Sequence, residues 1–339
     1  MTGKKFYTEV EIQPCHWPTG YSKKNMFIGS CFTENVGTRM ENLGFNTDIN
    51  PFGILYNPVS VANAIEQMLD KKVYTESDLI EAGGLWHSFD HHGRFSAVNT
   101  GEALGKINSR MQDSAEYLTS TDFLFITFGT SWIYTHIATG KTVANCHKIA
   151  AREFQKLRLN VSQIVETITK AIERIFAVNS KLKIIFTVSP VRHWSDGVIE
   201  NQRSKAALIL AIDELLKGDF GKRMAYFPAY EIVMDELRDY RFYREDMIHL
   251  TEVAVDYIWE KFSEYYIDRK SRDTLRQVNK ILLAKRHKPI HRNTPEFRKF
   301  VENTLRQIDR IESGNPHISL ALEKRYFWEV LDEICNKMK

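Results

Sequence analysis

The sequence predicts an α/β fold built on a parallel sheet. Over roughly the first 265 residues, short unbroken apolar runs alternate with longer amphipathic stretches. Strands covered on both faces read as continuous apolar runs, and the helices that connect them read with a helical period. A chain of 339 residues has room for two domains, or for one large domain with an appendage, and needs no disulfide or metal to stabilise its core.

The apolar runs predict five strands, at residues 25–29, 45–49, 122–128, 182–188 and 224–227. Apolar residues at helical spacing predict helices at residues 59–69, 161–178, 204–216 and 252–262. A parallel sheet gathers the carboxyl ends of its strands at one edge, where such folds place their functional residues. We therefore expect the functional residues to follow these strands directly.

Two segments interrupt the alternation. Residues 132–134 and 141–143 flank a turn at 138–140, which predicts a small hairpin inserted after the strand at 122–128. Residues 86–95 are rich in histidine and aromatic side chains and are predicted to form a loop.

The composition shifts near residue 268. Residues 268–339 hold 17 Lys or Arg and 10 Asp or Glu, a net charge of +7, so the remainder carries −4. This tail is predicted to form three amphipathic helices, near 272–285, 295–312 and 318–336, separated by prolines. We expect two parts, an α/β domain over residues 1–267 and a basic helical extension over 268–339.

The overall composition excludes several classes of protein. A net charge of +3 is too small for a disordered polyelectrolyte or a nucleic-acid coat. Four scattered cysteines without a CxxC motif provide no disulfide framework, and neither a secretory signal nor a transmembrane run is visible. We expect a soluble cytoplasmic protein that binds neither membrane nor nucleic acid, although the basic cluster at 285–288 leaves an anionic partner open.

The first candidate site is the pair Ser30 and Cys31. A predicted strand ends at Gly29, the pair follows directly, and a helix is expected to begin near Phe32 or Thr33. This arrangement exposes a nucleophile at the sheet edge, beside the helix N-terminus that favours an anion. The alternative is an ordinary strand-to-helix turn with an inert buried cysteine.

The second candidate is the pair Asp246 and His249, just before the last predicted helix of the α/β region. A carboxylate three residues before a histidine can orient the imidazole and stabilise its charged form, which leaves the other ring nitrogen as a base. The alternative is a helix-capping aspartate beside a surface histidine.

Together these segments resemble the GSCFA family, a group within the SGNH/GDSL hydrolase superfamily. The name motif stands here as residues 29–33, with Thr33 in place of the family's final alanine. Further resembling segments lie at 50–58, 127–132, 144–148, 187–193, 201–206 and 246–249. The resemblance spans residues 5–265, and the basic tail is expected to lie outside it.

The resemblance implies a flavodoxin-like three-layer α/β/α sandwich, ester hydrolysis through an acyl-enzyme, and no metal or organic cofactor. Aligned without gaps, the superfamily's first block places Cys31 at the nucleophile position, while a shift of one residue places Ser30 there. His249 then matches the general base and Asp246 the residue that orients it.

The same resemblance implies an oxyanion site. Gly53 matches the glycine whose N–H binds the oxyanion, and Gly129 opens the third block. Ser131 stands where the superfamily has an asparagine donor, and Asn145 on the inserted hairpin is a possible replacement. Losing one oxyanion donor typically costs about 10²–10³ in rate.

Several other residues are candidates for the substrate-facing wall. His87, with His91 and His92, suits a metal site, a pocket wall or a surface loop, and we expect no metal there. His147 has a structural or a pocket-lining role. Arg192 and His193 follow a strong strand, where Arg192 pairs either with an acidic substrate or with a core carboxylate.

These observations predict an acyl esterase acting on a small-molecule ester, with a carbohydrate as one possible carrier. The same site could run as an acyltransferase, because a cysteine acyl-enzyme is a thioester. A third reading is a binding protein that keeps the fold without turnover. The sequence leaves the acyl group, the acceptor and the oligomeric state open.

Overall fold

A computed structural model describes residues 7–287, 289–291 and 294–337 of the protein. Its central sheet has five strands, in the order β10-β9-β5-β1-β2, and every neighbouring pair is parallel. The strands are β1 (Lys24–Gly29), β2 (Asn46–Ile49), β5 (Phe123–Phe128), β9 (Lys183–Val188) and β10 (Met224–Tyr226). The five predicted strands are confirmed.

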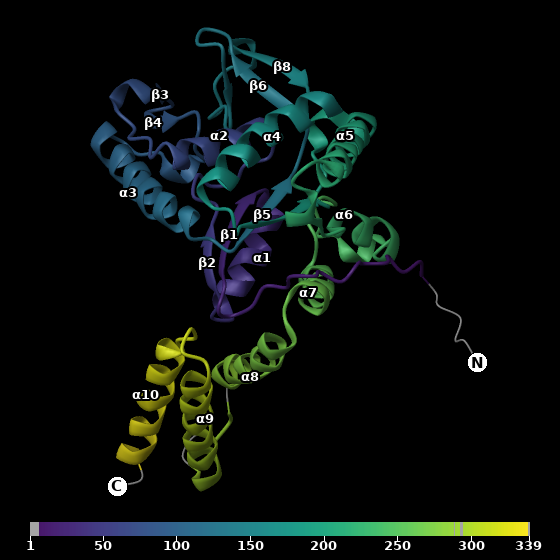
Figure 1. Ribbon diagram of the computed structural model, residues 1–339. Coiled ribbons are helices and arrows are strands. Elements are labelled where there is room, and N and C mark those ends of the chain that lie inside the picture. The colour runs from purple at the N-terminus through teal and green to yellow at the C-terminus, as the bar shows by residue number, and fades with distance from the viewer. Residues whose placement is uncertain (1–6, 288, 292–293, 338–339) are drawn as a thin grey trace, which may run out of the picture.

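Helices cover both faces of the sheet, which gives the expected flavodoxin-like three-layer α/β/α sandwich (Figure 1). One face carries α2 (Pro58–Leu69), α3 (Thr100–Thr119), α4 (Val161–Val178) and α5 (Gly197–Lys217). The other carries α1 (Cys31–Asn42), the short α6 (Ala229–Glu231) and α7 (Glu252–Tyr266).

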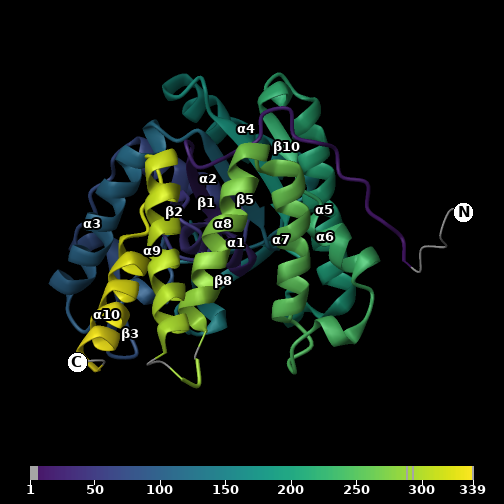
Figure 2. The ribbon, with the colours of Figure 1, turned by 90° about the horizontal axis from the view of Figure 1, so that it is seen from below.

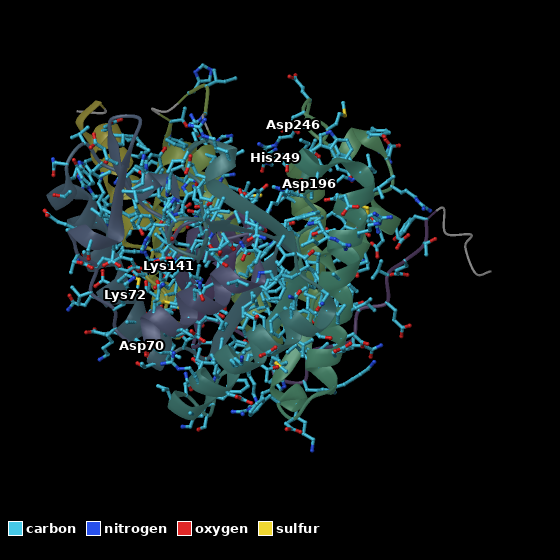
Figure 3. The ribbon with its side chains drawn as sticks, turned by 90° about the horizontal axis from the view of Figure 1, so that it is seen from above. Asp70, Lys72, Lys141, Asp196, Asp246 and His249 are labelled. Atoms are coloured by element: carbon cyan, nitrogen blue, oxygen red, sulfur yellow. The ribbon has the colours of Figure 1, made fainter. Side chains whose placement is uncertain are left out.

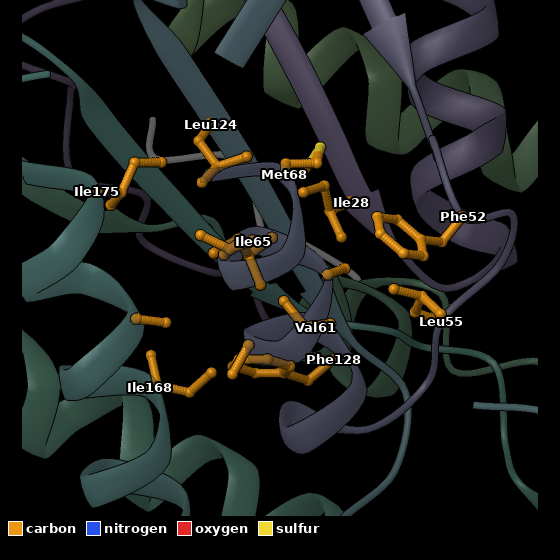
Figure 4. Packing of buried hydrophobic residues seen from close by; sticks show 14 of the residues in the cluster. Ile28, Phe52, Leu55, Val61, Ile65, Met68, Leu124, Phe128, Ile168 and Ile175 are labelled. Carbon is orange, nitrogen blue, oxygen red and sulfur yellow. The ribbon is translucent and has the colours of Figure 1, made fainter. Parts of the chain in front are cut away.

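Side chains of β1, β5 and β9 alternate between two buried clusters. Met26 and Ile28 of β1 pack toward α2 and α4, in the cluster of Figure 4, whereas Phe27 points to the opposite face and stacks on Phe125, with ring centroids 4.4 Å apart. Because both faces are covered, the strands read as unbroken apolar runs.

Short polar side chains fix where most of the long helices begin. Asparagine oxygens accept backbone N–H bonds at the starts of α2, α3 and α4, and Ser30 does the same for α1. Such N-caps satisfy N–H groups that the helix itself leaves unpaired.

The strand order reverses between β1 and β5. The chain passes from β1 to β2 at one edge and then returns to β5 on the other side of β1. Segments leaving the carboxyl ends of β1 and β5 therefore diverge, and in open α/β sheets ligands bind at that point.

Two small antiparallel sheets are added to the core, and here the sequence prediction was partly wrong. The hairpin of β6 (Trp132–His136) and β7 (Lys141–Val143) is present, but β8 (Phe154–Arg158) joins it as an unpredicted third strand. Part of the loop predicted at 86–95 is strand β4 (Leu85–Ser88), paired with β3 (Leu79–Ala82). Helix α3 was not predicted either.

The tail forms three helices as predicted, α8 (Arg269–Arg286), α9 (Pro295–Gly314) and α10 (Ala321–Lys337), and Figure 2 shows α8 between α7 and α9. Its buried apolar residues belong to the same cluster as Phe27 and Phe125.

Among the described residues, the salt bridges of the tail's basic side chains all join partners within the tail, such as Lys285 and Glu323. Apolar contact therefore holds the tail on the domain. Lys288, from the basic cluster, lies outside the described residues.

None of the described helices combines the length and apolar character needed to cross a membrane.

Candidate active site

The turn from β1 into α1 places Cys31 at the carboxyl edge of the sheet. Gly29 has φ +148°, and a Cβ atom there would lie 2.2 Å from the carbonyl oxygen of Thr127, so only glycine fits. The next residue, Ser30, donates its N–H to the same carbonyl at 3.2 Å. Helix α1 then begins at Cys31, beside the point where the strand order reverses.

Ser30 and Cys31 have different surroundings. Ser30 is 1% exposed, and its Oγ accepts the N–H of Phe32 at 3.3 Å as the N-cap of α1. Cys31 is only partly buried. The serine hydroxyl therefore serves the helix, while the cysteine sulfur is the more accessible of the two nucleophiles.

Several groups act on the Cys31 thiol. Burial raises its pKa, and the charge of Glu34 adds to that effect. The N–H groups of Phe32 and Cys31 and the cation of Lys205 oppose it and favour the thiolate, but the pKa stays above the ordinary value. The thiol therefore needs a base to react near neutral pH.

Asp246 and His249 form a hydrogen-bonded pair. The Nδ1 atom of His249 lies 2.6 Å from Oδ2 of Asp246, and Oδ1 accepts the N–H groups of Ile248 and His249, both at 2.9 Å. These bonds lower the pKa of Asp246 to about 2. Figure 3 shows the two residues together.

The other ring nitrogen of His249 has no hydrogen-bond partner within the described part of the chain. Neither Ser30 nor Cys31 is hydrogen-bonded to it there. The pair is thus oriented by its own turn, in which Met247 adopts φ +56°, and its free nitrogen is available to a substrate or a thiol.

Two of the expected oxyanion donors are already engaged. The N–H of Gly53 donates to the carbonyl of Asn50 at 2.7 Å. Ser131 is 0% exposed, and its N–H and Oγ both donate to Ser204 Oγ on α5, at 2.7 Å and 3.1 Å. In this conformation both groups stabilise loops.

The other two expected residues lie in tight loops. The N–H of Gly129 donates to the carbonyl of Tyr56 at 2.7 Å, and a Cβ on this glycine would lie 3.0 Å from the Tyr56 ring. Asn145 uses its Oδ1 to accept the N–H of His147 at 2.9 Å. Gly129 therefore makes room for Tyr56, and Asn145 shapes its own loop.

The histidines of the His-rich segment connect β4 to the inserted sheet. His87 and His147 stack with centroids 4.3 Å apart, and His147 Nε2 is 2.8 Å from the carbonyl oxygen of Ser88. Burial lowers the pKa of His147 to about 4 and that of His91 to about 3, so both rings are neutral near pH 7. No group of three or more metal-ligating side chains occurs among the described residues.

Arg192 and His193 lie in the loop after β9. The Arg192 guanidinium stands over the Trp194 ring at 5.8 Å, and no carboxylate pairs with it in the described ranges. It lines a cavity of about 410 Å³ with Tyr230, Tyr243 and Met247, and Met247 directly follows Asp246 in the chain. His193 Nε2 is 2.9 Å from Ser195 Oγ, and burial lowers the pKa of His193.

Sequence reasoning did not single out Tyr56 or Lys205. The Tyr56 ring packs on Gly129, is 38% exposed, and its hydroxyl has no hydrogen bond to the described residues. Burial raises the pKa of Tyr56, and the charges of Cys31 and Glu34 raise it further. Lys205 is 0% exposed. Each lies in a segment that resembles the family, but neither residue type indicates these surroundings.

The protein has an α/β fold with a cysteine at a helix N-terminus and a hydrogen-bonded Asp–His pair. The chain belongs to the GSCFA family, whose model matches residues 24–262. The model described as GSCFA domain protein, C-terminal domain, matches residues 278–333. The expectation that the basic tail lies outside the resemblance was therefore wrong.

No curated protein matches the chain. Among solved structures, a Clostridium thermocellum family 3 carbohydrate esterase has 12% identity and a TM-score of 0.32, over 75% of this chain and 97% of that one. An acetyl xylan esterase, Est2A, from the rumen bacterium Butyrivibrio proteoclasticus also has 12% identity and a TM-score of 0.32, over 62% of this chain and 56% of that one. Similarity at this level does not indicate a substrate.

Proposed function

We propose that the protein is an esterase that cleaves small acyl esters through an acyl-enzyme on Cys31. The observation that carries the proposal is the placement of Cys31, accessible in the first turn of α1 where the strand order reverses. The N–H groups of Phe32 and Cys31 favour its thiolate, while Ser30 is occupied as the N-cap.

In the proposed acylation step, His249 Nε2 takes the thiol proton as the sulfur attacks the ester carbonyl carbon. The new C–S bond gives a tetrahedral oxyanion. The oxyanion collapses by breaking the bond to the alkoxide, which takes the proton from His249 and leaves as the alcohol. Water, deprotonated by His249, then attacks the thioester, and the acid departs as the sulfur regains a proton.

Asp246 supports both steps. Its carboxylate accepts the Nδ1 proton of His249 and stays ionised over the working pH range, because its pKa is about 2. This bond fixes the tautomer that leaves Nε2 free as a base. We propose that the Asp246–His249 turn reaches the sulfur when bound substrate excludes water, since catalytic hydrogen bonds commonly tighten only in the complex.

The oxyanion is proposed to bind the Cys31 N–H and the Tyr56 hydroxyl. Ser131 and Gly53 already donate elsewhere, whereas the Tyr56 hydroxyl is unpaired among the described residues. Its raised pKa keeps it protonated and therefore a donor. A protonated donor at this position would replace the asparagine that the superfamily carries in its third block.

The ester is proposed to be carried by a small molecule or a carbohydrate. Trp194 and Tyr240 are exposed, and Tyr243 is half-buried, in the loops around Arg192 and Met247, and such rings suit stacking on sugars. The thioester intermediate would also pass its acyl group to a second alcohol, so the same site supports acyl transfer.

The test uses p-nitrophenyl acetate, p-nitrophenyl butyrate and an acetylated sugar with wild type, Cys31→Ala, Cys31→Ser and Ser30→Ala. Intact mass should show an acyl adduct on wild type that Cys31→Ala abolishes. Ser30→Ala is the matched control: losing the N-cap should cost about 1 kcal/mol of stability yet leave the adduct on Cys31.

Turnover by Cys31→Ala, or an adduct on Ser30, would contradict the nucleophile assignment. A folded wild-type protein that forms no adduct with any ester in the panel would support the binding-protein reading instead.

A further inference from the structure

Lys205 is a buried cation without a carboxylate partner. It lies on α5 with 0% of its surface exposed, and no salt bridge involving it occurs among the described residues. Its Nζ donates to three main-chain carbonyls, those of Gly129 at 2.6 Å, Ser189 at 2.7 Å and Val191 at 3.0 Å. Buried ammonium groups are costly and require such compensation.

The three carbonyls follow the carboxyl ends of two neighbouring strands. Gly129 comes directly after β5, and Ser189 and Val191 come after β9. The next strand along is β1, where Ser30 donates its N–H to Thr127 of β5. The ammonium group therefore lies beneath the edge at which Cys31 emerges.

The hydrogen bonds indicate the charge state of Lys205. An ammonium has three protons for three carbonyl oxygens, whereas a neutral amine would direct its lone pair at one of them. Burial lowers the pKa of Lys205 to about 7 even though the charge of Cys31 acts in the opposite direction. The three carbonyl acceptors favour the ammonium form of Lys205.

The coupling is reciprocal. Negative charge on Cys31 favours the protonated form of Lys205, and the cation of Lys205 lowers the pKa of the Cys31 thiol against the effects of burial and Glu34. Among the described residues, the hydrogen-bond partners of Lys205 are uncharged carbonyls and none is an acidic side chain. No carboxylate therefore neutralises its positive charge, which can stabilise a thiolate at Cys31.

We propose that Lys205 is a positioning residue of the Cys31 site: its buried ammonium holds the chain that leaves β5 and β9 and stabilises negative charge on the Cys31 sulfur. The catalytic consequence rests on the proposed function, but the effect on the sulfur is measurable without turnover. A purely structural lysine would hold the loops and leave the acidity of the thiol unchanged.

The experiment measures how fast iodoacetamide alkylates Cys31 in the folded full-length protein as pH rises, using peptide-resolved mass spectrometry to separate Cys31 from the other three cysteines. Lys205→Met removes the charge, and Lys205→Gln removes it while keeping an N–H donor for the carbonyls. Both substitutions should raise the midpoint, the pH at which Cys31 is alkylated at half its maximal rate, by about one unit. Below that pH the alkylation should then be roughly tenfold slower than in wild type. Lys205→Arg keeps the charge and should raise it less.

The matched control is Ser204→Ala. Ser204 precedes Lys205 on α5 and bonds to Thr130 and Ser131, so its loss loosens the same loop without removing a charge. Its midpoint should equal that of wild type. An unchanged midpoint in folded Lys205→Gln or Lys205→Met, or an equal shift in Ser204→Ala, would overturn the proposal.

A second measurement covers the case in which the neutral variants do not fold. In protein carrying ¹³C at the lysine ε-carbon, the titration of Lys205 is compared between wild type and Cys31→Ala. Because coupling is reciprocal, the Lys205 midpoint should fall when the sulfur is removed, and equal midpoints would refute the coupling. A shifted midpoint without any acyl adduct would uphold this inference and refute the esterase proposal.

Discussion

His249 Nδ1 lies 2.6 Å from Asp246 Oδ2 although the two side chains are 51% and 46% exposed. Exposed ion pairs contribute little to stability, so this one has no strong structural purpose. Its geometry is maintained by the local turn, in which the same carboxylate accepts two backbone N–H groups. A surface imidazole held in this orientation is what the proposed proton transfer requires.

We expect His249→Ala to lower kcat/KM for ester cleavage by about 10²–10⁴, because proton transfer contributes on that scale. Asp246→Asn should act in the same direction with a smaller loss. Steady-state rates on p-nitrophenyl acetate, with thermal denaturation to show intact folding, measure the effect.

The comparison variant is His193→Ala. His193 lies at the same edge, 6.5 Å from the Tyr56 ring, with its Nε2 near Ser195. A larger loss in His193→Ala than in His249→Ala would transfer the role of base to His193.

The pH dependence of acylation should follow the Cys31 thiol. Its raised pKa means that the thiolate fraction grows as pH increases through the neutral and mildly alkaline range. Asp246, with a pKa of about 2, does not titrate there. Burst-phase acylation of wild type should therefore rise with pH above neutrality. A rate that falls over this range would contradict a thiol nucleophile with this environment.

His91 should make the fold sensitive to acid. Burial lowers its pKa in the folded protein to about 3, whereas the pKa of histidine in the unfolded chain is near 6.5. The neutral ring therefore stabilises the fold fully above pH 6.5, and this stability is lost as the pH falls. Between pH 6.5 and 4 the loss should be on the order of 3 kcal/mol, at about 1.4 kcal/mol per unit.

The measurement is urea unfolding at pH 7 and near pH 4.5, in wild type and in His91→Phe. Phenylalanine keeps the ring that stacks on Phe52, with centroids 4.7 Å apart in wild type, but cannot be protonated. The variant should lose less stability than wild type between the two pH values. An identical loss would show that other groups control the acid response.

Tyr56→Phe should lower kcat by about 10²–10³ with little change in KM or thermal stability, because it removes one proposed oxyanion donor. The hydroxyl has no hydrogen bond to the described residues, so the fold loses nothing with it. Tyr134→Phe, on the inserted sheet, is the matched control and should keep wild-type kcat. Equal rates in both variants would exclude the Tyr56 hydroxyl.

The sequence predicted the central sheet well, because strands β1, β5 and β9 are apolar on both faces. Helix α3 was missed since Ala103, Ser114 and Ala115 on its buried side are small or polar and weaken the helical pattern. The sequence also predicted the turn that carries Cys31, because a predicted strand ends at Gly29.

The rest of the site depends on contacts between distant segments. Ser131 stands where a donor was expected, but Ser204, 73 residues later, engages it. Lys205 reads as a solvent-exposed residue, since a lone lysine is rarely buried, and only the fold brings three carbonyls to it.

The shared core of the tail and the sheet bears on synthesis of the chain. Helices α8–α10 supply apolar side chains to the cluster that contains Phe27 and Phe125, yet they leave the ribosome well after the strands of the sheet. That side of the sheet therefore stays incompletely covered until these three helices emerge. The nascent protein should be most prone to aggregation, and most dependent on chaperones, after the sheet has been released and before α8–α10 follow.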